Sequence, residues 1–134
     1  MIATSQKTLL SAIGRMVLPV VDLDVALSFY RDVLGFDVLH DQTDGGYRYL
    51  HVGLPGQEPV GVWLMPAGDS AGGGRREPGG RPSLVLYTVD LGRLALRLAE
   101  YGVRVWNERE DADSRSLHLA DPDGNTLIVV ELRG

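Results

Sequence analysis

The chain contains two copies of one pattern, each about half of its length. Three segments of the first half recur in the same order in the second. The pairs are Val21-Asp22-Leu23 with Val89-Asp90-Leu91, Gly35-Phe36-Asp37-Val38 with Gly102-Val103-Arg104-Val105, and Arg48-Tyr49-Leu50-His51-Val52 with Arg115-Ser116-Leu117-His118-Leu119. The offsets are 68, 67 and 67 residues. Two copies are too few for a solenoid, so the pattern predicts a duplicated supersecondary unit whose halves close over a shared cleft.

Size and composition favour one globular domain over residues 1–134. A chain of 134 residues, 44% of them hydrophobic, can bury its own core. The net charge is −5 and the basic residues are scattered, which argues against a nucleic-acid partner. No apolar run approaches the roughly 18 residues of a membrane span, and residues 1–14 do not resemble a signal peptide. The absence of cysteine excludes disulfides and thiolate ligands, and fits a cytoplasmic protein.

Each copy carries the signals of a βαβββ module. An apolar strand ends at an Asp that caps an amphipathic helix, a Gly ends that helix, and three strands follow. The expected strands lie at about 16–21, 36–41, 47–52 and 60–65, then 84–89, 103–106, 115–120 and 126–132; the expected helices lie at about 24–34 and 91–101. The segment Asp121-Pro122-Asp123-Gly124-Asn125 predicts a tight turn before the last strand.

A segment rich in Gly and Pro separates the copies. Residues 66–82 hold six glycines and three prolines in seventeen positions, the composition of a flexible connector. We therefore expect module one at about 15–65, a linker at 66–82 and module two at about 83–133. The sequence leaves open whether the linker is also a lid.

The paired modules resemble the vicinal oxygen chelate superfamily, which includes glyoxalase I, extradiol dioxygenases and bleomycin-binding resistance proteins. The helix Asp24-Val25-Ala26-Leu27-Ser28-Phe29-Tyr30-Arg31-Asp32-Val33-Leu34-Gly35 and the turn at 121–125 carry the resemblance. It implies an α+β fold in which two pseudo-symmetric βαβββ modules form a cupped mixed sheet around a cleft. It says little about activity, because one scaffold supports many functions.

The resemblance also implies where a divalent metal would bind in the enzymatic members. Those positions fall on Arg15, Trp63, Leu84 and Ile128, none of which is an ordinary metal ligand. Shifting the alignment by one residue does not bring in a ligand at any of them. We therefore expect no metal and no cofactor, and metal-dependent chemistry becomes a poor candidate.

Strand alternation suggests which side chains replace the metal. If the aliphatic residues of the repeated strands pack under the helices, their neighbours face the cleft. The predicted ligand-binding wall is Arg15, Tyr47, Tyr49, His51, Trp63 and His118. Aromatic rings supply stacking surface, and Arg15 suits an anionic or carbonyl oxygen. The same alternation predicts that His40 points away from the cleft, and Trp106, on an outer strand, is expected to lie outside it.

These observations favour a metal-independent small-molecule-binding protein resembling the bleomycin-resistance branch, used for drug or metabolite sequestration. We expect a flat, partly aromatic or carbonyl-rich ligand, no membrane partner, and a homodimer, because family members commonly pair modules across chains. Two alternatives stay open. One is a lyase- or dioxygenase-like enzyme with a rearranged site that uses His51, His118 and Glu131. The other is a degenerate regulatory or interaction module. In that case the wall residues are ordinary core or surface residues.

Overall fold

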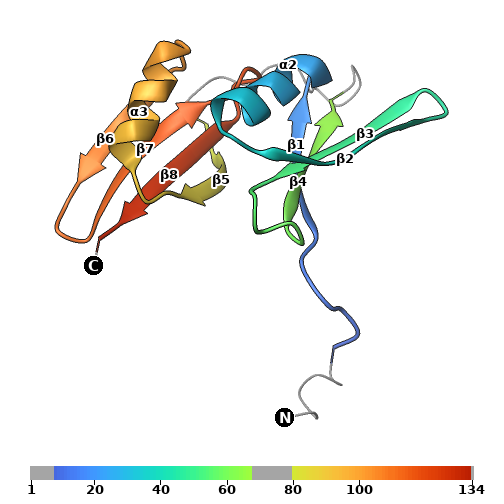
Figure 1. Cartoon of the computed structure of the whole chain (residues 1–134), viewed down its shortest axis with the longest axis horizontal. Coiled ribbons are helices and arrows are strands. Elements are labelled where there is room, and N and C mark those ends of the chain that lie inside the picture. The colour runs from blue at the N-terminus through green and yellow to red at the C-terminus, as the bar shows by residue number, and fades with distance from the viewer. Residues whose placement is uncertain (1–7, 68–79, 134) are drawn as a thin grey trace.

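The two predicted modules are present in the computed structural model, which describes residues 8–67 and 80–133. Module one consists of β1 (Arg15–Val20), α2 (Leu23–Ser28), the π-helical turn η1 (Phe29–Val33), β2 (Asp37–Asp44), β3 (Tyr47–Gly53) and β4 (Gly61–Pro66). Module two consists of β5 (Pro82–Tyr87), α3 (Leu91–Glu100), β6 (Val105–Glu110), β7 (Ser114–Ala120) and β8 (Thr126–Leu132). The modules lie side by side, each with a helix against its own sheet (Figure 1).

The two sheets have the same topology. Their strand orders are β1-β4-β3-β2 and β5-β8-β7-β6, and in each the first and last strands of the module pair in parallel. The other neighbours pair antiparallel. The predicted α+β fold of two βαβββ modules is therefore confirmed, and its strands form two four-stranded mixed sheets.

The repeated motifs form the ends of the helices. Asp22 accepts hydrogen bonds from the backbone N–H groups of the first turn of α2, and Asp90 accepts one at the start of α3. Gly35 and Gly102 follow the helices with φ of 80° and 69°, the left-handed conformation in which glycine has no steric penalty. The first helix was predicted to run unbroken to residue 34. Instead it widens after residue 28 into a π turn, a change that the apolar spacing alone does not distinguish.

Strand register divides each sheet into a helix-covered side and an open side. On the covered side, Leu50 pairs with Leu64 and Val52 with Val62, and all four are buried. Module two repeats this with Leu117 opposite Val129 and Leu119 opposite Leu127. These aliphatic pairs form the core under α2 and α3, so the alternate residues of the same strands must lie on the open sides.

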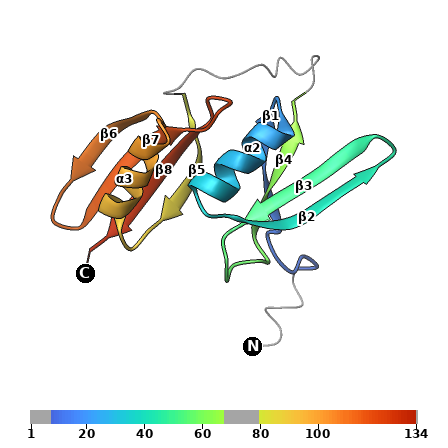
Figure 2. The same cartoon turned by 45° about the horizontal axis from the view of Figure 1, so that its top comes forward.

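The turn at residues 121–125 connects the two modules. Although it joins β7 to β8, its side chains bond to module one. Asn125 Nδ2 donates to the Pro19 carbonyl oxygen at 3.1 Å, and Asp123 Oδ1 accepts from the Val21 N–H at 2.8 Å. Asp121 Oδ2 accepts from the Tyr30 hydroxyl at 2.6 Å, where both residues are buried. The turn therefore fixes the end of β1 and the first helix against module two (Figure 2).

Most of the predicted linker lies outside the described residues. Its two ends belong to the sheets, because Pro66 is the last residue of β4 and Pro82 the first of β5. Residues 68–79, and with them the question of a lid, are not described. Among the helices of the described residues, none is long and apolar enough to cross a membrane.

Candidate functional site

Five of the six predicted site residues lie together on the open side of module one. Tyr47, Tyr49 and His51 alternate along β3, and His51 is directly opposite Trp63 of β4. Ring centroids are 4.7 Å apart for Tyr47 and Tyr49, 6.0 Å for Tyr49 and Trp63, and 5.1 Å for His51 and Trp63. With Arg15 of β1 they form a continuous half-buried surface, which we call the module-one wall.

Arg15 joins this wall through a direct bond to His51. Its Nε donates to His51 Nδ1 at 2.9 Å, and its Nη1 donates to the Gly14 carbonyl at 2.8 Å. The side chain crosses β4 above Gly61, where an added Cβ would lie 3.4 Å from Arg15 Cδ and only 2.9 Å from the Val52 carbonyl oxygen. The short distance to the Val52 carbonyl oxygen, on the neighbouring strand, is what favours glycine at position 61. Burial, then the charge of Arg15, lowers the pKa of His51 and favours the neutral imidazole.

His40 was predicted to point away from the cleft, and that prediction is wrong. A register shift between Val38 and His40 places Leu39 in a β-bulge, after which His40 pairs with His51. The ring centroids of His40 and His51 are 5.3 Å apart. Because side chains alternate with a period of two, one extra residue moves every following side chain to the other face. His40 therefore lies at the edge of the module-one wall.

The sixth residue, His118, lies on the open side of module two. It is opposite Ile128 of β8 and Trp106 of β6, and the centroids of His118 and Trp106 are 5.9 Å apart. Trp106 was expected to lie outside the cleft, but its ring lies beside His118 on the open side of module two. We call this surface the module-two wall: Val85, Tyr87, Trp106, His118 and Ile128. No hydrogen bond or ring contact between residues of the described ranges joins His118 to the module-one wall.

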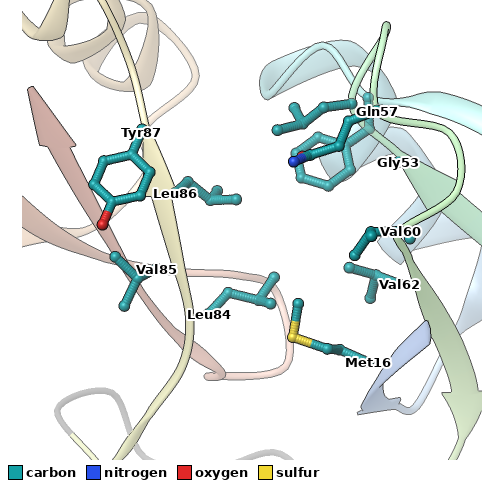
Figure 3. Close-up of a pocket in the computed structure, with 12 residues that line it drawn as sticks. Met16, Gly53, Gln57, Val60, Val62, Leu84, Val85, Leu86 and Tyr87 are labelled. Atoms are coloured by element: carbon teal, nitrogen blue, oxygen red, sulfur yellow. The ribbon is translucent and has the colours of Figure 1, made fainter. Parts of the chain in front are cut away.

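A further cavity lies between the modules. It has a volume of about 410 Å³ and is mainly apolar. Leu84 and Leu86 of β5 point across it toward Met16 and Val62 (Figure 3). Val85 and Tyr87 also line it, although their side chains leave β5 on the other side. None of the six predicted residues lines it. The residues predicted from the sequence do not include the lining of this cavity; the available signal was that Met16 and Leu84 occupy equivalent positions, 68 residues apart in the repeat.

The residues at the family's metal positions do not fit a metal. Arg15 and Trp63 belong to the module-one wall and Ile128 to the module-two wall, while Leu84 is buried beside the cavity. The neighbour of Ile128 on β5 is Val85, also not a ligand. No group of three or more His, Asp or Glu that would hold a metal ion occurs within the described residues.

Glu131, the carboxylate of the alternative enzymatic site, has a structural contact. Its Oε1 accepts a hydrogen bond from the Leu91 N–H at 2.6 Å, at the start of α3. It also lies on the helix-covered side of β8, since it is two residues from the buried Val129. The carboxylate therefore satisfies a helix terminus and faces away from His118.

Comparison with known proteins supports the same fold. The family model "Glyoxalase/Bleomycin resistance protein/Dioxygenase superfamily" matches residues 12–129. A search among curated proteins gives no significant match. Among solved structures, TnmS3, an antibiotic binding protein from Streptomyces sp. CB03234, is 28% identical with a TM-score of 0.77, covering 94% of this chain and 99% of its own.

Two further structures are similar over most of their length. A member of the glyoxalase/bleomycin resistance protein/dioxygenase superfamily from Sphaerobacter thermophilus DSM 20745 is 28% identical, with a TM-score of 0.77 and coverage of 92% of this chain and 99% of that one. A glyoxalase/bleomycin resistance protein from Streptomyces sp. CB03234 is 30% identical, with a TM-score of 0.69 and coverage of 88% and 98%.

Proposed function

Because this chain belongs to the glyoxalase/bleomycin resistance protein/dioxygenase superfamily, we propose that it binds and sequesters a small flat molecule without using a metal. The observation that carries the proposal is the module-one wall. At two of the positions where enzymatic relatives place metal ligands, this chain has Trp63 and Arg15, which join a row of aromatic rings. Such a surface offers stacking and hydrogen bonding, the requirements of a binding site for a planar ligand.

The antibiotic-binding relative is consistent with this proposal. TnmS3 is described as an antibiotic binding protein and covers nearly the whole of this chain. We propose a similar use here, the sequestration of a drug or metabolite. The enzymatic alternative is weaker, because His51 and His118 lie on different sheets and Glu131 caps a helix.

Purified protein is expected to contain no stoichiometric divalent metal. A metal that binds only the folded state raises its melting temperature by mass action, so added Zn, Ni, Mn or Fe(II) should leave Tm unchanged. Elemental analysis measures the metal content and thermal melts measure Tm, with a chelator-treated sample as the control. About one metal ion per chain, with a metal-dependent rise in Tm, would reject the proposed function and favour the enzyme.

The protein is also expected to be a homodimer. Val85 and Tyr87 on the open side of β5 are 52% and 67% exposed, so apolar surface of the module-two wall is available to a second copy. Val85→Lys should then weaken the dimer, while Leu96→Lys on the exposed side of α3 should not. Light scattering at micromolar concentration measures the mass. A clean monomer of 14.6 kDa for the wild type would contradict the prediction.

A further inference from the structure

Two ring N–H positions of the module-one wall have no partner. Trp63 Nε1 and His51 Nε2 are both buried, and neither has a hydrogen-bond partner within the described part of the chain. An indole N–H can only donate. A buried donor without an acceptor costs stability, so most such groups in folded proteins are paired. Because both nitrogens are covered, an acceptor from outside the chain reaches them only when neighbouring side chains move aside, and it would then remove that cost.

The bond from Arg15 determines the role of His51. An arginine Nε can only donate, so His51 Nδ1, at 2.9 Å from it, must accept through its lone pair. In the neutral imidazole the proton then lies on Nε2. Burial and the Arg15 charge, which lower the pKa of His51, favour this neutral ring. His51 Nε2 is therefore a second hydrogen-bond donor, on the strand next to Trp63.

Module two has a related arrangement with the two ring nitrogens exchanged. Asn107, which has a φ of 56° in the bulge of β6, accepts from Arg109 Nε at 3.0 Å through its Oδ1. Its Nδ2 then faces His118 Nε2 at 3.5 Å, whereas His118 Nδ1 is buried and has no hydrogen-bond partner among the described residues. Each of these two histidines thus has one contacted and one unpartnered ring nitrogen within the described part of the chain.

We infer that the module-one wall recognises a carbonyl oxygen on a flat ligand, through the Trp63 Nε1–H and the His51 Nε2–H, with Arg15 as the positioning residue that holds His51 in the required tautomer. This inference rests on the proposed function and specifies its ligand. Two neutral donors suit a neutral carbonyl, whereas a carboxylate is usually held by charge-assisted bonds. The Arg15 Nε and Nη1 groups are already bonded to His51 and to the backbone of Gly14. The ring of Tyr49, next to Trp63 in the module-one wall, supplies the stacking surface.

The test uses 9-fluorenone and fluorene, two flat compounds of almost the same shape that differ by a carbonyl. The full-length protein should bind fluorenone about tenfold more tightly, the value of roughly one net hydrogen bond. Trp63→Phe and His51→Phe keep a flat ring but lose the donor, so each should reduce this preference severalfold. Tyr101→Phe, at the exposed end of α3, is the control and should preserve it.

Nitrogen-15 NMR of the free protein tests the tautomer without any ligand. The expected spectrum has His51 protonated on Nε2 and not on Nδ1, and Arg15→Leu should lose that single tautomer. A His51 protonated on Nδ1 would overturn the inference. Equal affinity for the two compounds would also overturn the inference, but it would agree with the proposed sequestration. Binding of neither compound would count against both the inference and the proposed function.

Discussion

Replacing Asp121 with alanine is expected to destabilise the protein by about 3 kcal/mol or more, because the loss of a buried charged acceptor leaves its donors unsatisfied. The carboxylate accepts from the Tyr30 hydroxyl, the N–H groups of Asp123 and Asn125, and Asn125 Nδ2, at 2.6 to 2.9 Å. Asp121 is only 5% exposed, so water cannot easily replace it. Denaturant unfolding measures the free energy.

Two further variants show whether the loss arises from this network. Tyr30→Phe removes a single bond and should cost about 1–3 kcal/mol. Asp32→Ala breaks an exposed pair with Arg31 and should leave the unfolding midpoint almost unchanged. If Asp121→Ala unfolds at the same denaturant concentration as Asp32→Ala, the turn at 121–125 does not hold the modules together.

The same network gives stability a dependence on alkaline pH. Burial, then the charge of Asp121, raises the pKa of Tyr30 well above its ordinary value. The unfolded chain releases this proton near pH 10 while the folded chain retains it. The contribution of Tyr30 is therefore fully present below about pH 10 and decreases above it. The free energy of unfolding of Tyr30→Phe, measured with denaturant, should therefore fall less than that of the wild type as the pH rises above about 10.

Replacing Trp63 with alanine is expected to weaken binding of a flat ligand by about tenfold or more, since the variant loses both the indole N–H donor and the ring surface beside the ligand. The indole lies between the rings of Tyr49 and His51, at the centre of the module-one wall. Quenching of tryptophan fluorescence by 9-fluorenone gives the affinity of the wild type, and calorimetry compares the variants. Tyr101→Ala, at the exposed end of α3, should bind like the wild type.

Trp106→Ala extends this comparison to module two. From the sequence this variant is expected to bind normally, but the structure places Trp106 beside His118 on the module-two wall. A loss similar to that of Trp63→Ala would mean that both walls contact the ligand. A loss only in Trp63→Ala would restrict the site to module one. If Trp63→Ala binds as tightly as the wild type, the module-one wall is not the ligand site.

The sequence predicts the face of a side chain correctly only where its strand is regular. Simple alternation correctly placed Tyr47, Tyr49 and His51 on one face because β3 has no bulge between them. It failed for His40, where the bulge at Leu39 reverses the alternation. No residue type in that strand indicates the bulge. A prediction that assumes strict alternation of side chains therefore gives the wrong face for the residues that follow it.

Contacts between distant segments were the other part that the sequence did not reveal. The bond from Arg15 to His51 depends on a long side chain crossing a glycine on an intervening strand. The segment at 121–125 was recognised as a turn from its Asp, Pro and Gly residues. Its bonds to Pro19 and Val21 have no local signal, because those partners are more than 100 residues away in the chain.

The position of this turn has a consequence for how the chain reaches its native state. The bonds that close the junction connect residues separated by 91, 102 and 106 positions, so they form only after nearly the whole chain has been made and has collapsed. Pairings of such high sequence separation slow folding, because the entropy of closing the loop is lost before the contact forms. Although the two halves repeat one plan, neither half alone holds both the turn and its hydrogen-bond partners in the first module. We therefore expect the duplicated chain to fold as one cooperative unit, in which the bonds at the junction between the copies form last.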